Sequence, residues 1–368
     1  MPRRPRARIV VKSVVKEGSV AVEQVQSGSV PAAQAGEGRR RLLQEFGRTA
    51  GLVGTIVLVM AIFAIASDGR FLQPENLLGL LRYMSTLAIV GLGLTVVLIV
   101  GEIDLSFGAV YGFSGMITAV AWISWGWSIG MAIGLALASA ILVGLFNGFF
   151  TTVTKIPSFI ATLGASTLVF GFTLLVSGSA TFSPMQPGPG RTMNEEQVAF
   201  FRGLSNQDLP LGLPMGAVWM VVIALGFWYL ISKSLFGFRL KAIGGNPIAA
   251  QFARIPVRRY KIWSFVICAM SAAVAAILVF AFIGSVQPDS GAGLLFPTFA
   301  AVVIGGASLS GGRGTVLGTL LGCLLLAILN NGLALMAAGA FLQQIFIGVV
   351  TIGAVVLDQA TQRWRRDA

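Results

Sequence analysis

The sequence predicts an all-α polytopic membrane protein with about ten transmembrane helices. Of its 368 residues, 55% are hydrophobic and only 11% are charged, whereas about a quarter of the residues of a soluble domain carry a charge. Ten apolar runs reach or approach the roughly 18 residues that cross a bilayer. Because lipid offers the backbone no hydrogen-bond partner and the runs lack the alternation of barrel strands, each run is predicted to be a helix.

The apolar runs follow one another with short interruptions. They cover about 50–67, 77–100, 105–125, 127–153, 156–180, 214–232, 262–284, 294–309, 314–337 and 341–357. The run at 294–309 is short and rich in Gly, and the run at 156–180 opens with Pro157. Proline cannot continue a helix from the preceding turn, so either run is expected to be a partial or broken helix.

The two ends of the chain differ in composition from the apolar region. Residues 1–48 are rich in Arg, Val, Gly, Ser and Gln without a helical period, which predicts a disordered basic cytoplasmic tail that favours anionic membrane lipid. The first apolar run starts about fifty residues in, so this stretch is expected to be a tail and not a cleaved signal. Residues 49–360 form the predicted transmembrane domain, and residues 361–368 a second basic cytoplasmic tail.

The distribution of Lys and Arg predicts the orientation. With the N-terminus in the cytoplasm, 22 of the 26 basic residues fall on the cytoplasmic side, as the positive-inside rule requires. Both termini are then cytoplasmic. The loop 233–261 becomes the largest internal loop and 181–213 the largest external one.

Ten spans allow two inverted halves of five, an arrangement common in transporters. The stretch "LFNGFFTTVTKIPSFIATLG" at the fourth and fifth runs resembles "LNNGLALMAAGAFLQQIFIG" at the ninth and tenth. In both, 17 residues separate the Asn of an Asn-Gly pair from a closing Gly, Asn147 from Gly164 and Asn331 from Gly348. A 5+5 inverted repeat is the prediction, with chance similarity of Gly-rich segments as the alternative.

The stretch "GGASLSGGRGT" at 305–315 only superficially resembles a phosphate-binding loop. Gly306 and Gly311 have the spacing of that motif, but Gly312 stands where its Lys should be, and the motif needs this Lys for the phosphates. A tight turn between two closely packed helices is the better interpretation.

Two carboxylates, Glu102 and Asp104, stand between the second and third runs in "GEIDLSFGAVYG". Acids near membrane depth are candidates for a proton relay or a cation site. The structural alternative, which we favour, places them at the cytoplasmic boundary, where Asp104 with Ser106 caps the next helix. Few other acids lie in the spans, and an ion-driven transporter usually needs more.

Neutral polar side chains within the spans predict a path for an uncharged polar solute. Amides and hydroxyls can hydrogen-bond a polyhydroxy solute, and an aromatic face can pack on a sugar ring. The alternative is helix-to-helix hydrogen bonding, at about 0.6 kcal/mol per bond. The candidate pathway residues are Asn147, Phe159, Thr162, Ser166, Asn331 and Gln344.

The internal loop contains a predicted short helix that begins at Asn246. Asn is a good N-cap, Pro247 suits the first helical position, and two Ala residues follow. Ile248, Phe252 and Ile255 are expected to form one apolar stripe, with Pro256 ending the helix. Such a stripe must be buried against lipid headgroups or in the groove of a partner protein.

Five motifs in one order resemble the permease subunits of ribose- and xylose-type ABC importers. They are "GEIDLSFGAVYG", "KIPSFIATLG", "FGFRLKAIGGNPIAAQFARIPVRRYKI", "AAVVIGGASLSGGRGTVLGTLLG" and "ILNNGL", and the likeness runs from about residue 50 to 360. Two departures are Glu102, where the family usually has Gly, and Ile248, where many members have Glu.

The resemblance implies a non-catalytic inner-membrane permease that works as a homodimer or a pair. Its partners would be a cytoplasmic ATPase that binds ATP-Mg and an extracytoplasmic sugar-binding protein, with no cofactor bound by this chain and no nucleic acid. A pentose such as xylose or ribose is the favoured solute. The coupling helix contacting the ATPase would involve Gly244, Gly245, Asn246, Pro247, Ile248, Ala250, Phe252 and Ile255.

Other functional classes stay open at the level of the sequence. An ion-coupled secondary transporter would use Glu102 and Asp104, and a lipid-sensing or scaffold protein would move no solute. Within ABC permeases, the solute could instead be a nucleoside or a branched-chain amino acid. Uptake that depends on ATP and not on an ion gradient would exclude the ion-coupled transporter.

Overall fold

The computed structural model describes residues 32–188, 192–206, 209–337 and 339–367, with side chains described from residue 49 to residue 356 apart from a few loop positions. The described residues are almost entirely helical, and an isolated antiparallel bridge joins Phe182 to Val286. Residues 52–368 form one compact unit, to which the account below refers; the other unit, residues 1–51, contributes the described helical residues 32–51.

The ten predicted spans correspond to ten apolar helices, which confirms a polytopic all-α membrane protein. Eight are long and apolar enough to cross a bilayer. The other two have shorter apolar stretches: α11 (Leu295–Ile304) is itself short, and in α13 (Ala340–Asp367) only Phe341–Val356 is apolar. The eight are α1 (Ala32–Ala66), α2 (Pro74–Ile99), α3 (Phe107–Ala119), α4 (Ile129–Val153), α5 (Ser158–Ser177), α7 (Met215–Ser232), α10 (Val257–Ile283) and α12 (Val316–Leu335). A π-helical turn, Val120–Ser124, continues α3.

Three further helices lie between the spans. Of the two runs expected to be partial or broken helices, only one is. The connecting helices are α6 (Glu195–Gly203), α8 (Leu235–Gly245) and α9 (Pro247–Phe252). Helix α11 has 10 residues, or about 15 Å, so the run at 294–309 is indeed a partial helix. Helix α5 is unbroken because its 20 residues begin directly after Pro157.

The beginning of α1 differs from the sequence expectation. Residues 32–48, expected to belong to a disordered tail, have a helical backbone continuous with the first span. Residues 1–31 lie outside the described residues. At the other end, the backbone of α13 stays helical through Asp367, so the helix includes most of the basic stretch 361–368.

Helices α2 and α10 lie side by side at the centre of the bundle and pack closely because small residues face each other. A Cβ on Gly93 of α2 would lie 2.7 Å from the Cβ of Ser271 on α10. On the other side of α10, Gly144 and Gly148 of α4 contact its backbone at Val266 and Ile262. Such close approach is typical of helix packing in membranes, where dispersion forces and not hydrophobic burial hold helices together.

The helix contacts repeat between the two halves. Helix α2 packs on α10, α11 and α12, while α10 packs on α2, α3 and α4. In the same way α3 contacts α5, and α11 contacts α13. Matching α2–α5 with α10–α13 therefore reproduces the contacts, and the two Asn-Gly stretches of the sequence fall on equivalent helices. The match covers four of the five helices of each predicted half and is consistent with the predicted 5+5 arrangement.

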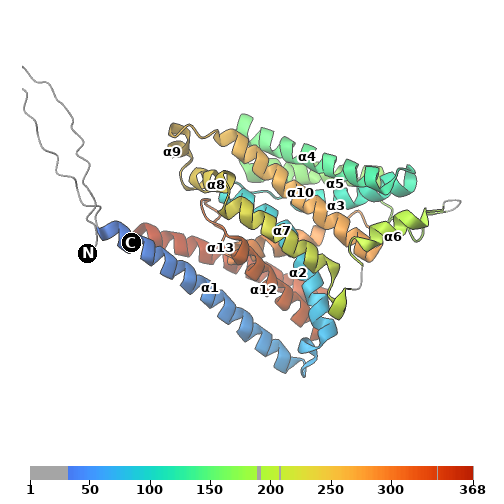
Figure 1. Ribbon diagram of the computed structural model, residues 1–368, viewed down its shortest axis with the longest axis horizontal. Coiled ribbons are helices and arrows are strands. Elements are labelled where there is room, and N and C mark those ends of the chain that lie inside the picture. The colour runs from blue at the N-terminus through green and yellow to red at the C-terminus, as the bar shows by residue number, and fades with distance from the viewer. Residues whose placement is uncertain (1–31, 189–191, 207–208, 338, 368) are drawn as a thin grey trace, which may run out of the picture. The chain divides into compact units, whose positions relative to one another are not determined.

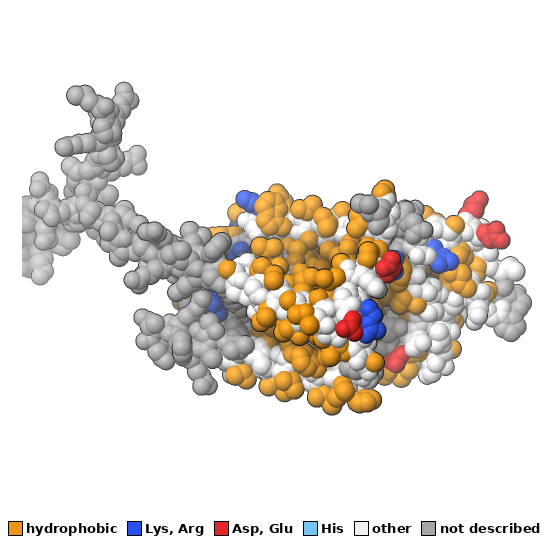
Figure 2. Space-filling view, turned by 90° about the horizontal axis from the view of Figure 1, so that it is seen from below, with side chains coloured by type: hydrophobic (Ala, Val, Ile, Leu, Met, Phe, Trp, Pro, Cys, Tyr) orange, Lys and Arg blue, Asp and Glu red, His pale blue; other side chains and the backbone are white. Residues whose placement is uncertain are grey.

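The two ends of the bundle carry the two large loops. Helices α8 and α9 lie at one end, and α6 lies at the opposite end (Figure 1). Hydrophobic side chains cover most of the face seen in Figure 2, and the charged groups on it are few. Exposed apolar side chains on α4, α5 and α7, such as Leu142, Leu175 and Leu225, suit contact with lipid or with another membrane helix.

The predicted orientation can be tested with single cysteines at the two ends. In a parent in which the buried Cys268 and Cys323 are replaced by Ala, Gly203→Cys on α6 is expected to react with an impermeant maleimide from outside. Arg258→Cys is expected to react only from the cytoplasm, because its loop carries the basic residues. Labelling in intact cells and in inverted vesicles measures both, and the reverse pattern would invert the topology.

Candidate functional site

The short helix α9 has the predicted start. The Asn246 side chain accepts a hydrogen bond from the Ala249 amide at 2.9 Å, and Pro247 occupies the first helical position. The helix turns Ala250 into the protein and presents Ile248 and Phe252, 67% and 85% exposed, to the outside. Two large apolar side chains on an exposed end of the bundle are a typical protein-docking feature.

The predicted stripe is wrong at Ile255. Helix α9 ends at Phe252 because Arg254 adopts a left-handed conformation (φ 58°), and the Ile255 amide donates back to the Ala250 carbonyl at 3.0 Å. This C-terminal motif reverses the chain before Pro256. As a result Ile255 packs with Ala250 and Val257 on the core and does not join Ile248 and Phe252.

The end of α8 contacts two other loops through glycines. A Cβ on Gly244 would overlap the Ile99 carbonyl oxygen and the Gly312 amide nitrogen, and that amide donates to Ile99 at 2.8 Å. A Cβ on Gly311 would lie 2.8 Å from the Gly244 oxygen and 2.9 Å from the Gly101 Cα. We call Gly101, Gly244, Gly311 and Gly312 the glycine junction. It joins α8, the end of α2 and the α11–α12 loop backbone to backbone.

The stretch 101–106 after α2 belongs to no helix or strand and is anchored by a charge pair. Gly101 has φ 86°, a conformation that Gly adopts readily, and it turns the chain out of α2. The Glu102 carboxylate then forms an ion pair with the Lys261 ammonium near the start of α10. Glu102 therefore has a basic partner and ties this stretch to α10.

Asp104, predicted to lie at the cytoplasmic boundary, is buried inside the bundle. It is fully buried, and the Cys268 thiol of α10 contacts it. Cys268 is eleven residues beyond the first residue of α10, which corresponds to about 16 Å along the helix axis. The stretch from Gly101 to Ser106, the 101–106 segment below, therefore re-enters the bundle.

The expected capping role of Ser106 is also replaced by a different arrangement. Ser106 occupies the N-cap position of α3, but its side chain caps no amide. Instead the Ser106 amide and hydroxyl both donate to Asp104 Oδ1, at 2.8 and 2.7 Å. Asn147 of α4 donates to the Ser106 oxygen at 2.7 Å. The two bonds to Oδ1 offset part of the cost of burying a carboxylate, whereas Oδ2 has no hydrogen-bond partner among the described residues.

Helix α5 binds the 101–106 segment through a row of hydroxyls. The Ser158 and Thr162 side chains accept hydrogen bonds from the Ile103 and Leu105 amides, each at 3.0 Å. Ser158, Thr162 and Ser166 recur every four residues, which places them on one face of the helix. Two of the predicted pathway residues, Asn147 and Thr162, thus meet at the 101–106 segment.

A cavity of about 330 Å³ begins at the third hydroxyl of this row. It lies between α3, α5 and the stretch Gly284–Leu294, the 284–294 segment below, which connects α10 to α11. Its wall combines hydroxyls, an aromatic ring, a carboxylate and exposed backbone. The residues that supply these groups are Ser166, Thr167 and Phe170 of α5, Asp289, and Gly108 and Gly112 of α3.

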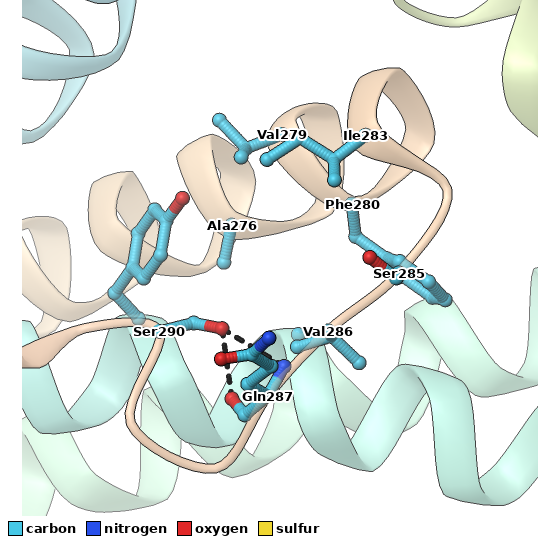
Figure 3. A pocket seen from close by; sticks show the side chains of 10 residues that line it. Ala276, Val279, Phe280, Ile283, Ser285, Val286, Gln287 and Ser290 are labelled. Atoms are coloured by element: carbon cyan, nitrogen blue, oxygen red, sulfur yellow. Dashed lines mark hydrogen bonds between the residues drawn. The ribbon is translucent and has the colours of Figure 1, made fainter. Parts of the chain in front are cut away.

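A second cavity, of about 320 Å³, flanks the other side of the 284–294 segment. Figure 3 shows Ala276 and Val279 of α10 on one wall and Gln287 with Ser290 on the facing wall. The Ser290 hydroxyl donates to the Gln287 carbonyl at 2.8 Å and accepts from its amide at 3.0 Å. The 284–294 segment therefore separates two cavities.

The remaining predicted pathway residues lie elsewhere. Asn331 exchanges two hydrogen bonds of 2.9 Å with Asn76 of α2, which is helix-to-helix bonding. Phe159 and Gln344 are exposed on the surface of the described chain. Sequence reasoning missed Phe170 and Asp289 as cavity residues. Phe170 is detectable four residues after Ser166, but no local pattern brings Asp289 to α5.

Comparisons with known proteins all find transport permeases. A sequence profile of the family described as branched-chain amino acid transport system / permease component matches residues 76–355. The ribose import permease protein RbsC of Bacillus subtilis is 35% identical over 318 residues, which cover 86% of this chain and 94% of that protein. The xylose transport system permease protein XylH of Escherichia coli is 29% identical over 360 residues, covering 85% of this chain and 92% of XylH.

Proposed function

Because the chain belongs to the family of branched-chain amino acid transport system permease components, we propose that it is the channel-forming permease of an ATP-driven monosaccharide importer. The observation that carries the proposal is the likeness to the ribose permease over 86% of this chain. A pentose such as ribose or xylose is the proposed solute, since a ribose permease and a xylose permease are similar to the chain over 86% and 85% of its length.

The cavity between α3 and α5 suits such a solute. Its volume of about 330 Å³ falls within the range of small-molecule sites. Ser166 and Thr167 can donate and accept hydrogen bonds, the Asp289 carboxylate accepts them, and Phe170 offers an aromatic face. These groups match a ring that carries hydroxyls on its edges and C–H groups on its faces.

The proposed partners follow from the same assignment. Helix α9 would insert Ile248 and Phe252 into a groove of a cytoplasmic ATPase, in the manner of an apolar helix in a groove. That subunit would bind ATP-Mg and hydrolyse the nucleotide, so this chain would be non-catalytic. An extracytoplasmic binding protein would deliver the sugar, and a second permease copy would complete the membrane unit.

An ion-coupled transporter is the second candidate, and the structure weakens it. Glu102 is neutralised by Lys261, so Asp104 alone remains of the two carboxylates expected to bind the ion. In the described part of the chain, no group of three or more His, Cys, Asp or Glu side chains could hold a metal ion. In vesicles that contain the complex, import should stop when ATP is depleted and continue in the presence of an uncoupler. Loss of import with the uncoupler alone would favour the ion-coupled alternative.

The solute cavity predicts an effect of Asp289. Asp289→Asn is expected to raise the sugar concentration for half-maximal uptake about tenfold, because a hydrogen bond to a charged group contributes about 1.5–3 kcal/mol. Glu196→Gln, at an exposed acid of α6, is the matched control and is expected to change nothing. Equal uptake curves for the wild-type and Asp289→Asn proteins would remove Asp289 from the solute path.

A further inference from the structure

We propose that the 101–106 segment is the inner gate of the solute path and that α9 moves it through the glycine junction. The proposal rests on the proposed function and names its moving part. In this arrangement Gly101, Gly244 and Gly311 are positioning residues. They touch no solute, but they link the ATPase-docking helix to the seal below the cavity.

The location of the 101–106 segment makes it the seal. Along α5, the cavity ends at Ser166, and one turn further towards the N-terminus of the helix Thr162 binds the Leu105 amide. One more turn on, Ser158 binds the Ile103 amide. A solute that leaves the cavity along this row of hydroxyls therefore meets the 101–106 segment. To pass, it must replace these two backbone hydrogen bonds with its own.

The segment is built to move as a unit. Its backbone from Glu102 to Leu105 belongs to no helix or strand. Displacing it affects helical hydrogen bonds only at its two ends, where the Glu102 amide donates to the Val97 carbonyl of α2 and the Ser106 carbonyl accepts from the Val110 amide of α3. Its contacts to α5 are hydrogen bonds to the hydroxyls of Ser158 and Thr162, which water or a sugar hydroxyl can replace. Its anchors to the rest of the bundle are the Glu102–Lys261 ion pair and the buried Asp104, and both must move or be released when the segment moves. Gly101 at its start has φ 86°, and a glycine tolerates the dihedral changes of a hinge.

The glycine junction couples this hinge to α9. Gly244 lies at the end of α8, two residues before the N-cap of α9, and its backbone contacts Ile99 and Gly312 directly. Gly101 and Gly311 are in contact in the same layer. With no side chains between these backbones, a shift of α9 cannot be absorbed by rotamer changes. It must move the end of α2 or the α11–α12 loop.

The second half of the chain contains the counterpart of the proposed gate. The 284–294 segment precedes α11 as the 101–106 segment precedes α3, and it too begins with a left-handed glycine, Gly284 with φ 74°. The cavity lies between the two, lined by Gly108 from the first turn of α3 and by Asp289. Alternating access needs such a pair of barriers on opposite sides of one site.

A reversible cross-link between the gate and α5 tests the proposal. Ile103→Cys and Ser158→Cys are introduced together into a parent that carries Cys268→Ala and Cys323→Ala. The 3.0 Å contact between the Ile103 amide nitrogen and the Ser158 oxygen limits the separation of the two Cα atoms to about 7 Å or less, close to the distances that disulfides span. Oxidation is expected to lower sugar uptake in vesicles at least about tenfold, and reduction to restore it. Binding of the ATPase should not change.

The controls separate the gate from the proposed function. Each single cysteine variant should transport equally well before and after oxidation, and recovery on reduction excludes misfolding. Full uptake by the oxidised, cross-linked protein would overturn the gate alone. Failure of both this pair and the pair Leu105→Cys with Thr162→Cys to cross-link would also overturn it. If the wild-type protein imports no sugar at all, the proposed function fails, and the gate fails with it.

Discussion

Replacing Gly244 with Ala is expected to lower solute import by at least about tenfold while the protein still inserts into the membrane. The added methyl group would overlap the Ile99 carbonyl oxygen and the Gly312 amide. Backbone atoms cannot rotate away as side chains can, so the junction must open. Overpacking of this kind destabilises the folded state by about 1–3 kcal/mol or more, which is enough to separate the backbones that meet at the glycine junction. Uptake by reconstituted vesicles measures the effect.

The adjacent glycine supplies the matched control. Gly245 has no heavy atom within 4 Å of the position of an added Cβ, and it belongs to the same helix and the same Gly-Gly-Asn-Pro motif. Gly245→Ala is therefore expected to leave import within about twofold of the wild type, since Ala favours a helix over Gly. Equal loss in both variants would mean that the motif matters through its outer surface and not through the junction.

Replacing Phe252 with Asp is expected to abolish association with the ATPase. Phe252 is 85% exposed on α9, and removal of such an aromatic anchor commonly costs about 2 kcal/mol or more of binding free energy, or about thirtyfold in affinity. Membrane insertion should be unchanged because the side chain packs on nothing in the described chain. Co-purification of the two subunits in detergent measures the loss.

Gln251→Ala is the control for this variant. Gln251 is an exposed polar neighbour on the same helix, and most residues around a docking anchor contribute little to affinity. Its complex with the ATPase should be retained. Normal co-purification of the Phe252→Asp protein would contradict the assignment of α9 as the coupling helix.

The sequence predicts the spans well because each is a local property. About 18 apolar residues in a row require a bilayer or a buried environment, whatever the rest of the chain does. The short α11 is predictable for the same reason, from the length of its run. The C-terminal reversal at Arg254 is not, because it depends on a left-handed residue other than glycine. The apolar period alone therefore assigns Ile255 to the wrong face.

The candidate site is only partly predictable because its contacts join distant parts of the chain. Asn147 and Thr162 are identifiable as polar residues in apolar runs, and the fold brings both to the 101–106 segment. Asn331 has the same appearance in the sequence but pairs with Asn76. The turn at 305–315 is predictable from its glycines, while its contact with Gly244 requires three loops to meet. Sequence spacing carries no information of that kind.

The most direct test is uptake by the permease reconstituted with its ATPase and binding protein. The labelled panel should contain ribose, xylose, a nucleoside and leucine, with ATP or a non-hydrolysable analogue on the cytoplasmic side, inside right-side-out vesicles. Import of a pentose that depends on ATP hydrolysis and persists with an uncoupler is the predicted result. Import of leucine or the nucleoside alone, or of any solute without ATP, would contradict the assignment as an ATP-driven monosaccharide permease.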